Sequence, residues 1–523
     1  MLNASLNPDE SEHLHAAWLV GDGRVPFLDF WDHHAPLLFY LLAPLTRWLA
    51  DTPNVYFAAR AVMVVTSGVA LVLVYRLACR LSTSAAMAAV LLLAFLPRFV
   101  DKTTEVRPDV PALVAWLAAL LALVRWRERA APAWLWIAGF ALGGAVALNL
   151  KAAYGAVGVA VVVALASRGD GAGAVRRAAA GLARLVAGAA VLPGAVVMTL
   201  WLDGGRAALE ALVTEVVVGN LRFVDFRKEL PLGGSLGLVA LAIGGIAMTA
   251  RREGRLLTHP LHGPLLVPMG VISLGLLLPT TPGVGVYAWL PVLTPAAAYA
   301  GLALTALLDR AAPGAIRPRV VAGAALVAGL VVPAAYSSKL ALVEDNADQL
   351  GTMRALLRHA CPGEPVLDGT ALYVFRPPAY RHRVFILGIR EWIATGVIAE
   401  EQLVEEIRRA RPRVAYPDRR LRAILQVAAF VERHYVPHPD GILVPGATIT
   451  VPGGPSGGRV TVELVAAGPY RLMLTDGLAV TIDGTPARRG MMELGAGPHA
   501  IAWTGPPGTI RLAAATCLER SRL

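Results

Sequence analysis

The sequence predicts a polytopic α-helical membrane protein of about ten spans that ends in an α/β region followed by a β-sandwich. Three observations support this fold class. Of the 523 residues, 56% are hydrophobic and only 16% are charged, whereas soluble domains carry nearer a quarter of charged residues. Apolar stretches long enough to cross a bilayer recur between residues 57 and 339. After about residue 340 the composition changes to short strand-like and helix-like runs.

Ten mostly apolar stretches are the predicted spans, because a crossing helix needs about 20 such residues. Alternate connections between them carry clusters of arginine, which is typical of cytoplasmic loops, and the other connections are richer in acids. This places the N-terminal segment, the acidic loops and the C-terminal part outside the cytoplasm. The stretches cover residues 57–80, 84–100, 109–125, 133–149, 151–168, 180–202, 232–250, 264–279, 286–308 and 320–337.

The flanking regions complete the predicted domain organisation. Residues 1–56 are polar and amphipathic and contain no signal peptide, so we expect an extracytoplasmic loop with interfacial helices. Since the N-terminus would then lie outside with no span before it, we expect that a first transmembrane helix is missing. Residues 57–339 form the transmembrane domain, 340–440 an extracytoplasmic α/β domain, and 441–523 an extracytoplasmic β-sandwich. Tyr470 and Trp503 of the sandwich are candidates for stacking on a sugar.

Charge and cysteine content exclude several classes of protein. The net charge of +11 comes from dispersed arginines that punctuate apolar runs, which favours membrane topology over a nucleic-acid surface. Three cysteines are too few for a disulfide scaffold or a zinc ribbon. Cys361 and Cys517 could pair if the C-terminal part is extracytoplasmic, but we expect two free thiols.

The stretch "NPDESEHLHAAW", residues 7–18, gathers titratable groups near the start of the chain. Paired carboxylates such as Asp9 and Glu10 can divide acid–base work between them. Composition alone favours a solvated N-terminal segment. A metal site is the third possibility, because Asp9 and His13 share one face of a helix, but no established zinc motif is present.

Three further stretches place charges at the expected outer membrane boundary. "GRVPFLDFWDHHAPLLFYLLAPL", residues 23–45, reads as an interfacial segment, and its His34 could also bind a phosphate there. "FVDKTTEVRPDVPALVAW", residues 99–116, mixes Glu105, Arg107 and Asp109 beside a span. Lys151 lies in "ALNLKAAYGAVG". It either snorkels to the interface or has a function, and a charge in such a position is functional by default.

The order of these motifs resembles the membrane glycosyltransferases of the GT-C type, particularly the protein O-mannosyltransferases and the aminoarabinose transferases of lipid A. The resemblance covers about residues 7–305 and rests on five segments in sequence. These are "PDE", "VPFLDFWDHHAPLLFY", "RPDVPAL", "LNLKAAYG" and "VYAWLPVLTPAAAYAGLAL". Family members begin with one transmembrane helix before the acidic pair, which agrees with the expectation of a missing first helix.

The resemblance implies specific roles for residues of this chain. Asp9 would be the catalytic carboxylate, paired with Glu10. His34 stands where the family often has a lysine, and a histidine is only partly charged at neutral pH. The remaining positions implied to bind substrate or its phosphate are Glu105, Arg107, Asp109, Lys151 and Tyr287. Because Asp9 lies near the chain end, and termini fray unless tied down, we expect it to be held poorly, which would leave this chain inactive.

The implied activity is transfer of a sugar from a polyprenyl-phosphate donor to a hydroxyl group on the extracytoplasmic face of the cell's inner (plasma) membrane, with inversion at the anomeric carbon. The acceptor would be a lipid, a glycan or a protein. No cofactor is required with certainty, no metal ligand is assigned, and a divalent metal is possible; no nucleic acid is expected as a partner. The rival interpretations are a transporter or lipid-linked sugar flippase, and a non-catalytic scaffold.

Overall fold

The computed structural model describes most of the chain. It covers residues 4–167, 172–219, 229–230, 234–278, 281, 284–310, 345–385, 389–452 and 454–522. Between 320 and 335 it describes only residues 320, 321, 323, 324, 327, 331, 332, 334 and 335. The tenth predicted span, 320–337, therefore lies largely outside the described residues.

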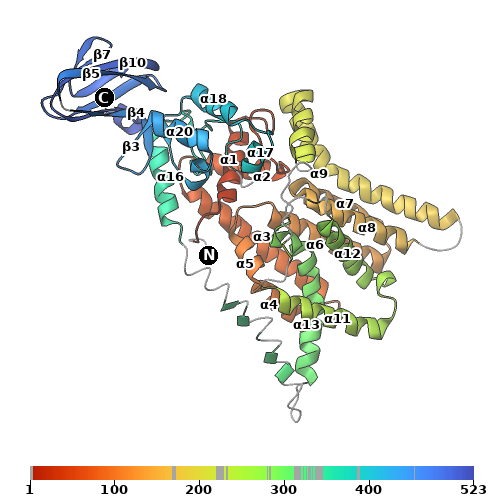
Figure 1. The fold of residues 1–523 in the computed structure, drawn as a ribbon. Coiled ribbons are helices and arrows are strands. Elements are labelled where there is room, and N and C mark those ends of the chain that lie inside the picture. The colour runs from red at the N-terminus through yellow and green to blue at the C-terminus, as the bar shows by residue number, and fades with distance from the viewer. Residues whose placement is uncertain are drawn as a thin grey trace.

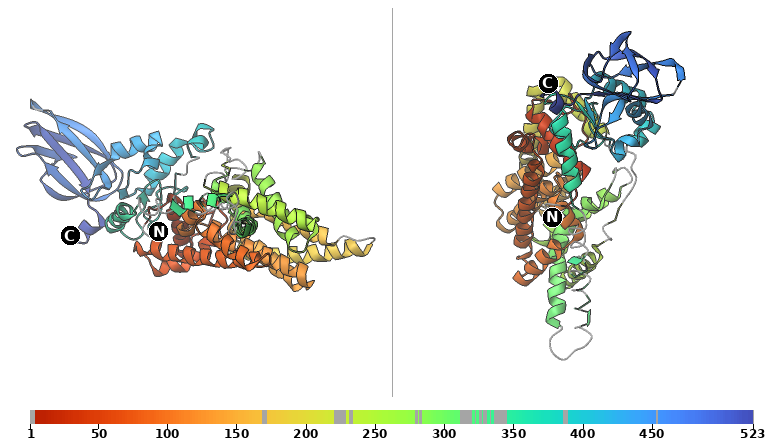
Figure 2. Two further views of the ribbon diagram at one scale, coloured as in Figure 1. Left: turned by 90° about the horizontal axis from the view of Figure 1, so that it is seen from below. Right: turned by 90° about the vertical axis from the view of Figure 1, so that its left-hand side faces the viewer.

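The molecule is elongated, with a helical body at one end and a β-sandwich at the other (Figures 1 and 2). The first helix and the α/β region lie between these two parts. The helices of the body and its N-terminal flank are α1 Pro8–Gly21, α2 Leu37–Trp48, α3 Asn54–Ala78, α4 Thr83–Ala94, α5 Pro97–Thr104, α6 Asp109–Arg129, α7 Ala133–Leu148, η1 Leu150–Ala152, α8 Ala153–Ala166, α9 Ala172–Leu212, η2 Val213–Val218, α11 Leu236–Glu253, η3 Leu256–Thr258, α12 His262–Leu277, η4 Val286–Trp289 and α13 Leu290–Arg310.

The helical body bears out the prediction of a polytopic membrane protein. Each of the first nine predicted stretches overlaps a helix or a bent pair of helices. Within the described part of the chain, four helices are long and apolar enough to cross a membrane, and a bent pair would add a fifth. The four are Asn54–Ala78, Asp109–Arg129, Gly173–Val216 and Tyr287–Arg310, and four shorter apolar helices accompany them.

The predicted span 84–100 is not one straight helix. The chain leaves helical geometry at Leu96, and α5 continues at an angle of 66° to α4. Pro97 explains the break, because proline lacks a backbone N–H and disfavours helical geometry in the residue before it. After the bend, Lys102 of α5 and Glu105, which follows it, lie beside the start of the first helix, where Glu105 accepts from the Asn7 side chain.

Glycine allows α7 and α9 to pack with their backbones in contact. A Cβ atom at Gly139 would lie 2.2 Å from the carbonyl oxygen of Leu185, and one at Gly143 would lie 2.2 Å from that of Ala189. Small residues at such positions are the usual means by which membrane helices approach closely.

The C-terminal part combines helices with two sheets. One sheet has the strand order β1-β2-β4-β11-β6-β9 with β3 also paired to β4, and the other has the order β5-β10-β7-β8. The two antiparallel groups bury a core that includes Tyr470, Leu472, Ile501 and Ile510. Tyr470 is fully buried and donates a hydrogen bond to the carbonyl oxygen of Ala466 (2.6 Å), so the expectation that it stacks on a sugar is wrong.

These elements are α16 Ala347–His359, β1 Val366–Leu367, α17 Ile389–Ala394, α18 Glu400–Ala410, β2 Val414–Ala415, α19 Arg419–Arg422, α20 Leu425–His434, β3 Tyr435–Pro437, β4 Leu443–Val451, β5 Gly454–Leu464, β6 Gly468–Leu474, β7 Ala479–Ile482, β8 Thr485–Ala487, β9 Gly490–Leu494, β10 Gly497–Gly505, β11 Gly508–Ala514 and α21 Cys517–Arg520. The first sheet runs on from the α/β region into the sandwich, because β2 and β3 both pair with β4.

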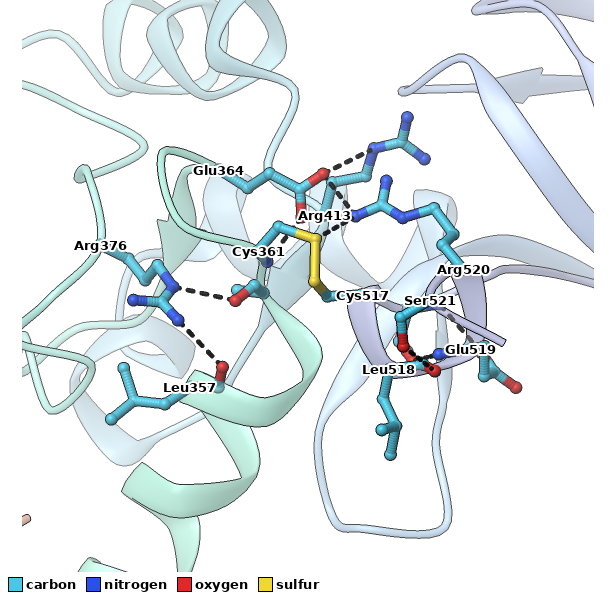
Figure 3. Close-up of a disulfide and its surroundings, with 12 residues drawn as sticks. Leu357, Cys361, Glu364, Arg376, Arg413, Cys517, Leu518, Glu519, Arg520 and Ser521 are labelled. Carbon is cyan, nitrogen blue, oxygen red and sulfur yellow. Dashed lines mark hydrogen bonds and ion pairs between the residues drawn. A yellow bond between two sulfur atoms is a disulfide. The ribbon is translucent and has the colours of Figure 1, made fainter. Parts of the chain in front are cut away.

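A disulfide joins Cys361, just after α16, to Cys517 at the start of α21 (Figure 3). The Cα atoms of the two cysteines lie 5.1 Å apart, within the usual range for a disulfide. Beside the bond, Arg520 donates to the Glu364 carboxylate (2.6 Å). The expectation of two free thiols is therefore wrong. Its failure has a simple reason: the fold returns the chain to α16 after 156 residues, a proximity that no local pattern encodes.

Candidate functional site

Helix α1 is anchored at its first turn, contrary to the expectation that the acidic pair is held poorly. The Asn7 side chain accepts from the backbone N–H of Asp9 (3.1 Å), and Glu10 accepts from the backbone N–H of Asn7 (2.9 Å), which completes a capping box. Glu10 is fully buried, and its two carboxylate oxygens accept from Nη2 (2.7 Å) and Nε (2.9 Å) of Arg60. Arg60 also binds the carbonyl oxygens of Ala4 and Ser5.

Asp9 lies at one end of a chain of polar contacts. Arg107 donates through Nη1 to Asp9 and through Nε to Asp109 (2.8 Å). Asn149 then donates to the second oxygen of Asp109 (3.1 Å). The Arg107 guanidinium lies 4.5 Å from the centre of the Tyr287 ring, a cation–π contact. Predicted residues from three separate segments are thus brought together, and Asn149 joins them from a fourth.

Electrostatics keep Asp9 ionised. Burial raises the pKa of Asp9, but the charge of Arg107, followed by smaller contributions from His13, His34 and Arg420, lowers it overall to about 2. The side chain nevertheless stays 31% exposed, whereas that of Arg107 is only 7% exposed. Asp9 is therefore a carboxylate that a substrate can reach, held from behind by a buried cation.

Glu105 binds neighbouring side chains of the protein and is not open to a substrate in the way that Asp9 is. Its carboxylate accepts from Lys102 Nζ (2.6 and 2.7 Å) and from the Asn7 side chain (3.2 Å). Burial is the largest influence on the pKa of Glu105 and raises it overall, against the charges of Lys102 and Arg107. These contacts link the loop after α5 to the start of α1.

His34 belongs to a second buried cluster beside α1, where the centre of its ring lies 4.5 Å from that of the His13 ring. Its Nδ1 lies 3.0 Å from Asp32 Oδ1, and Asp32 is also bound by the fully buried Arg383. Burial lowers the pKa of His34, but its hydrogen bond to Asp32 and the charges of Asp32 and Glu12 raise it overall. The surroundings therefore favour the charged imidazolium at a position where the resemblance implies a cation.

Metal ligands are available in the same cluster. Single ligand atoms of Glu12, Asp32, His33 and His34 all lie within 4.8 Å of one another. Asp32, however, already satisfies both of its oxygens with His34 and Arg383, so a divalent ion would have to share this carboxylate with a guanidinium. The residues present therefore fit an ion-pair network better than a metal centre.

Two cavities are lined by neighbours of Asp9 and Arg107, though by neither residue itself. The smaller, of about 40 Å³, is lined by Asp109, Asn149, Lys151 and Tyr287 together with apolar residues of α6, α12 and α13. The larger, of about 500 Å³, is lined by Pro8 and Ser11 of α1 and by segments of the α/β region. Lys151 is placed at the smaller cavity by Asn149, whose side chain accepts from the Lys151 backbone N–H (3.0 Å).

Sequence reasoning missed two buried arginines that hold the site. Arg60 was visible only as an isolated charge in an apolar stretch, and Arg383 as one of several basic residues near a strand-like run. An intramembrane charge normally has a partner, and that rule, applied to Arg60, would have pointed to an acid of the N-terminal segment. Nothing in the sequence pairs Arg383 with Asp32, which lies 351 positions earlier.

Comparison with known proteins supports the resemblance. Residues 33–197 match the family model described as dolichyl-phosphate-mannose-protein mannosyltransferase. Among solved structures, ArnT from Cupriavidus metallidurans bound to undecaprenyl phosphate has a TM-score of 0.55 at 15% identity, over 85% of this chain and 94% of that one. The Archaeoglobus fulgidus oligosaccharyltransferase in complex with Zn and sulfate has a TM-score of 0.50 at 14% identity, over 86% of this chain and 68% of that one. No curated protein sequence is significantly similar.

Together, the family-model match and the shared fold confirm the predicted resemblance to GT-C-type membrane glycosyltransferases.

Proposed function

We propose that this membrane glycosyltransferase of the GT-C type moves a sugar from a polyprenyl-phosphate donor to an acceptor hydroxyl, with Asp9 as the base. One observation carries the proposal: Asp9 is a partly exposed, ionised carboxylate held by Arg107, its neighbour Pro8 lines one cavity, and Asp109, the other partner of Arg107, lines the second. A base at such a point can reach an acceptor in one cavity while a donor occupies the other.

The donor phosphate binds at the smaller cavity, which at about 40 Å³ has to widen to take it. Lys151 supplies positive charge there, and Arg107 lies at its edge through its contact with Asp109. The apolar wall around Leu113, Trp116 and Leu276 suits the first units of a lipid tail. The ArnT structure was obtained with undecaprenyl phosphate bound, which supports a lipid-linked phosphate as the donor's carrier for this chain as well.

The reaction is a single displacement. The acceptor oxygen attacks the anomeric carbon, the bond from that carbon to the phosphate oxygen breaks, and Asp9 takes the hydroxyl proton. A positioned base of this kind contributes roughly 10²- to 10⁴-fold. Preorganised cations at Lys151 and Arg107 stabilise the departing phosphate. As negative charge grows on the phosphate, the Arg107 guanidinium interacts more strongly with the leaving group and less strongly with Asp9. The pKa of Asp9 then rises, so Asp9 becomes a stronger base as the proton is transferred.

Glu10 has a positioning role in this proposal. Both of its oxygens are occupied by Arg60, and it is fully buried, so it fixes the helix that carries Asp9. His34 adds positive charge that acts on Asp9 and helps to keep it ionised. Glu105 holds the loop that carries Arg107.

We further propose that the site faces the extracytoplasmic side of the inner membrane. The disulfide between Cys361 and Cys517 supports this orientation, because disulfides persist in oxidising compartments. The α/β region that bears Cys361 also lines the larger cavity, so site and disulfide lie on one side of the membrane.

The test is Asp9→Asn in reconstituted membranes supplied with a polyprenyl-phosphate sugar. We expect sugar transfer to fall at least about 100-fold while donor binding persists. Asp22→Asn is the matched control, since Asp22 is an exposed aspartate at the other end of α1, and it should keep full activity. Full transfer by Asp9→Asn would refute the assignment of the base. Movement of the donor lipid across liposomes without its cleavage would favour the flippase alternative.

A further inference from the structure

The larger cavity lies where the α/β region meets the start of α1. Its floor includes Pro8 and Ser11, the residues that flank Asp9 and Glu10 in α1, and its opposite wall is formed by residues 416–424 around α19. With about 500 Å³, it has the size of an ordinary small-molecule site. It is separate from the smaller cavity that carries Lys151.

Two arginines line this cavity without a partner of their own. Among the described residues, neither Arg419 nor Arg420 forms a side-chain hydrogen bond or ion pair. Two other arginines of this region do have partners: Arg376 pairs with Asp51, and Arg381 with Glu215. Arg419 is exposed and Arg420 is half-buried, so both guanidinium groups are open to an anion that enters the cavity.

The nearest carboxylate does not cancel these charges. Asp418 is the side-chain cap of α19, and its oxygens accept from the backbone N–H groups of Gly369, Arg420 (2.6 Å) and Leu421 (3.1 Å). It is therefore held by the backbone and forms no ion pair with either arginine. The charge of Arg420 does act on Asp418, but two cations face one carboxylate, which leaves this wall of the cavity net positive.

The other walls are mostly apolar and partly aromatic. Leu372, Phe385 and Ile424 contribute carbon surface, while Tyr416 and Thr370 bring hydroxyl groups. A carbon-rich ring with hydroxyl groups and one anionic substituent matches these walls, as a sugar phosphate or an acidic sugar would. Arg420 also lies close enough to Asp9 for its charge to act on that carboxylate, so an anion bound by Arg420 would lie near the base.

We propose that the larger cavity is the acceptor site and that Arg419 and Arg420 select a saccharide that carries an anionic group near its reacting hydroxyl. This inference rests on the proposed function, because it gives the acceptor its chemical class. A lipid-anchored and a soluble saccharide share this chemistry.

The test compares an anionic with a neutral acceptor in wild type and in the double variant Arg419→Gln/Arg420→Gln. The probes are a phosphorylated disaccharide and its dephosphorylated form, each used free in solution and attached to a lipid anchor. We expect wild type to prefer the phosphorylated probe, and the double variant to lose about 10- to 100-fold in kcat/KM for that probe alone. Arg422→Gln is the matched control, as an exposed arginine of α19 that does not line the cavity.

Two readouts keep this proposal distinct from the proposed function. Binding of the donor should be unchanged in the double variant, because neither arginine lines the smaller cavity. Direct binding of the phosphorylated disaccharide to the Asp9→Asn protein, by calorimetry in detergent, should be lost when the two arginines are also replaced. Equal use of both probes by wild type, or unchanged binding in the double variant, would overturn the acceptor site. Binding without any sugar transfer would instead refute the proposed function. Activity with the lipid-anchored probe only would identify a lipid as the carrier of the anionic saccharide.

Discussion

Replacing Arg60 by methionine should release the first turn of α1 and, with it, Asp9. The guanidinium is 1% exposed and binds both oxygens of Glu10, which is fully buried. Without it, Glu10 would be a buried charge with no cation, and breaking a buried pair in this way costs about 3–5 kcal/mol. The carbonyl oxygens of Ala4 and Ser5 would lose a donor as well. The segment that precedes Asp9 should therefore open far more often.

Hydrogen exchange measured by mass spectrometry can read this opening directly. A local cost of about 3–5 kcal/mol corresponds to roughly 100- to 4000-fold faster exchange in peptides that cover α1, while peptides from the β-sandwich should not change. Sugar transfer should fall in parallel. The double variant Arg60→Met/Glu10→Gln should recover much of the protection, because removing both charges avoids the unpaired one. Unchanged exchange in Arg60→Met, or no recovery in the double variant, would refute the anchoring role of this pair.

Three further outcomes follow from the same structure. Lys151→Ala should raise KM for the donor by roughly 10- to 100-fold, with partial rescue by Lys151→Arg, as measured by donor titration. Replacing Cys361 and Cys517 by serine should cost up to about 5 kcal/mol of stability, by the entropy of a loop of that length, and limited proteolysis should then separate the sandwich from α16. Burial, and next the charge of Asp418, raise the pKa of Asp368 to about 7. Asp368 therefore stabilises the fold most at low pH, and its contribution is lost as the pH rises from about 4 through 7. Asp418→Asn removes the repulsion, so its melting temperature should fall less between pH 5 and pH 8 than that of wild type.

The helical body was predictable because its signals are local. A run of apolar residues is sufficient to predict a span. Nine of the ten predicted stretches overlap a helix or a bent pair of helices. Pro97 marked a break that the prediction passed over, although proline effects are also local. The disulfide was different in kind, because Cys361 and Cys517 become neighbours only through the packing of a whole sandwich.

In the candidate site, too, local sequence patterns predicted individual residues but not the contacts between distant segments. Asp9, Arg107 and Asp109 each stand in a short polar stretch beside an apolar one, which is why the sequence singled them out. Their contacts through Arg107 bring together segments 98 residues apart. The supporting pairs, Glu10 with Arg60 and Asp32 with Arg383, connect distant segments in the same way, but one member of each looked unremarkable in sequence. The two cavities lie between chain segments and left no pattern at all.

The disulfide also sets an order of events during synthesis of the protein. Cys517 follows Cys361 by 156 residues, which at about 5–20 residues per second takes roughly 8–30 s to make. For that interval Cys361 is an unpaired thiol on the segment that will cover α1. The remaining cysteine, Cys79, follows α3, and under the proposed topology it lies across the membrane, out of reach. The bond can therefore close only when the sandwich between the two cysteines has been translocated and folded, so the wall of the acceptor cavity is locked in place late, after the helical body is already in the bilayer.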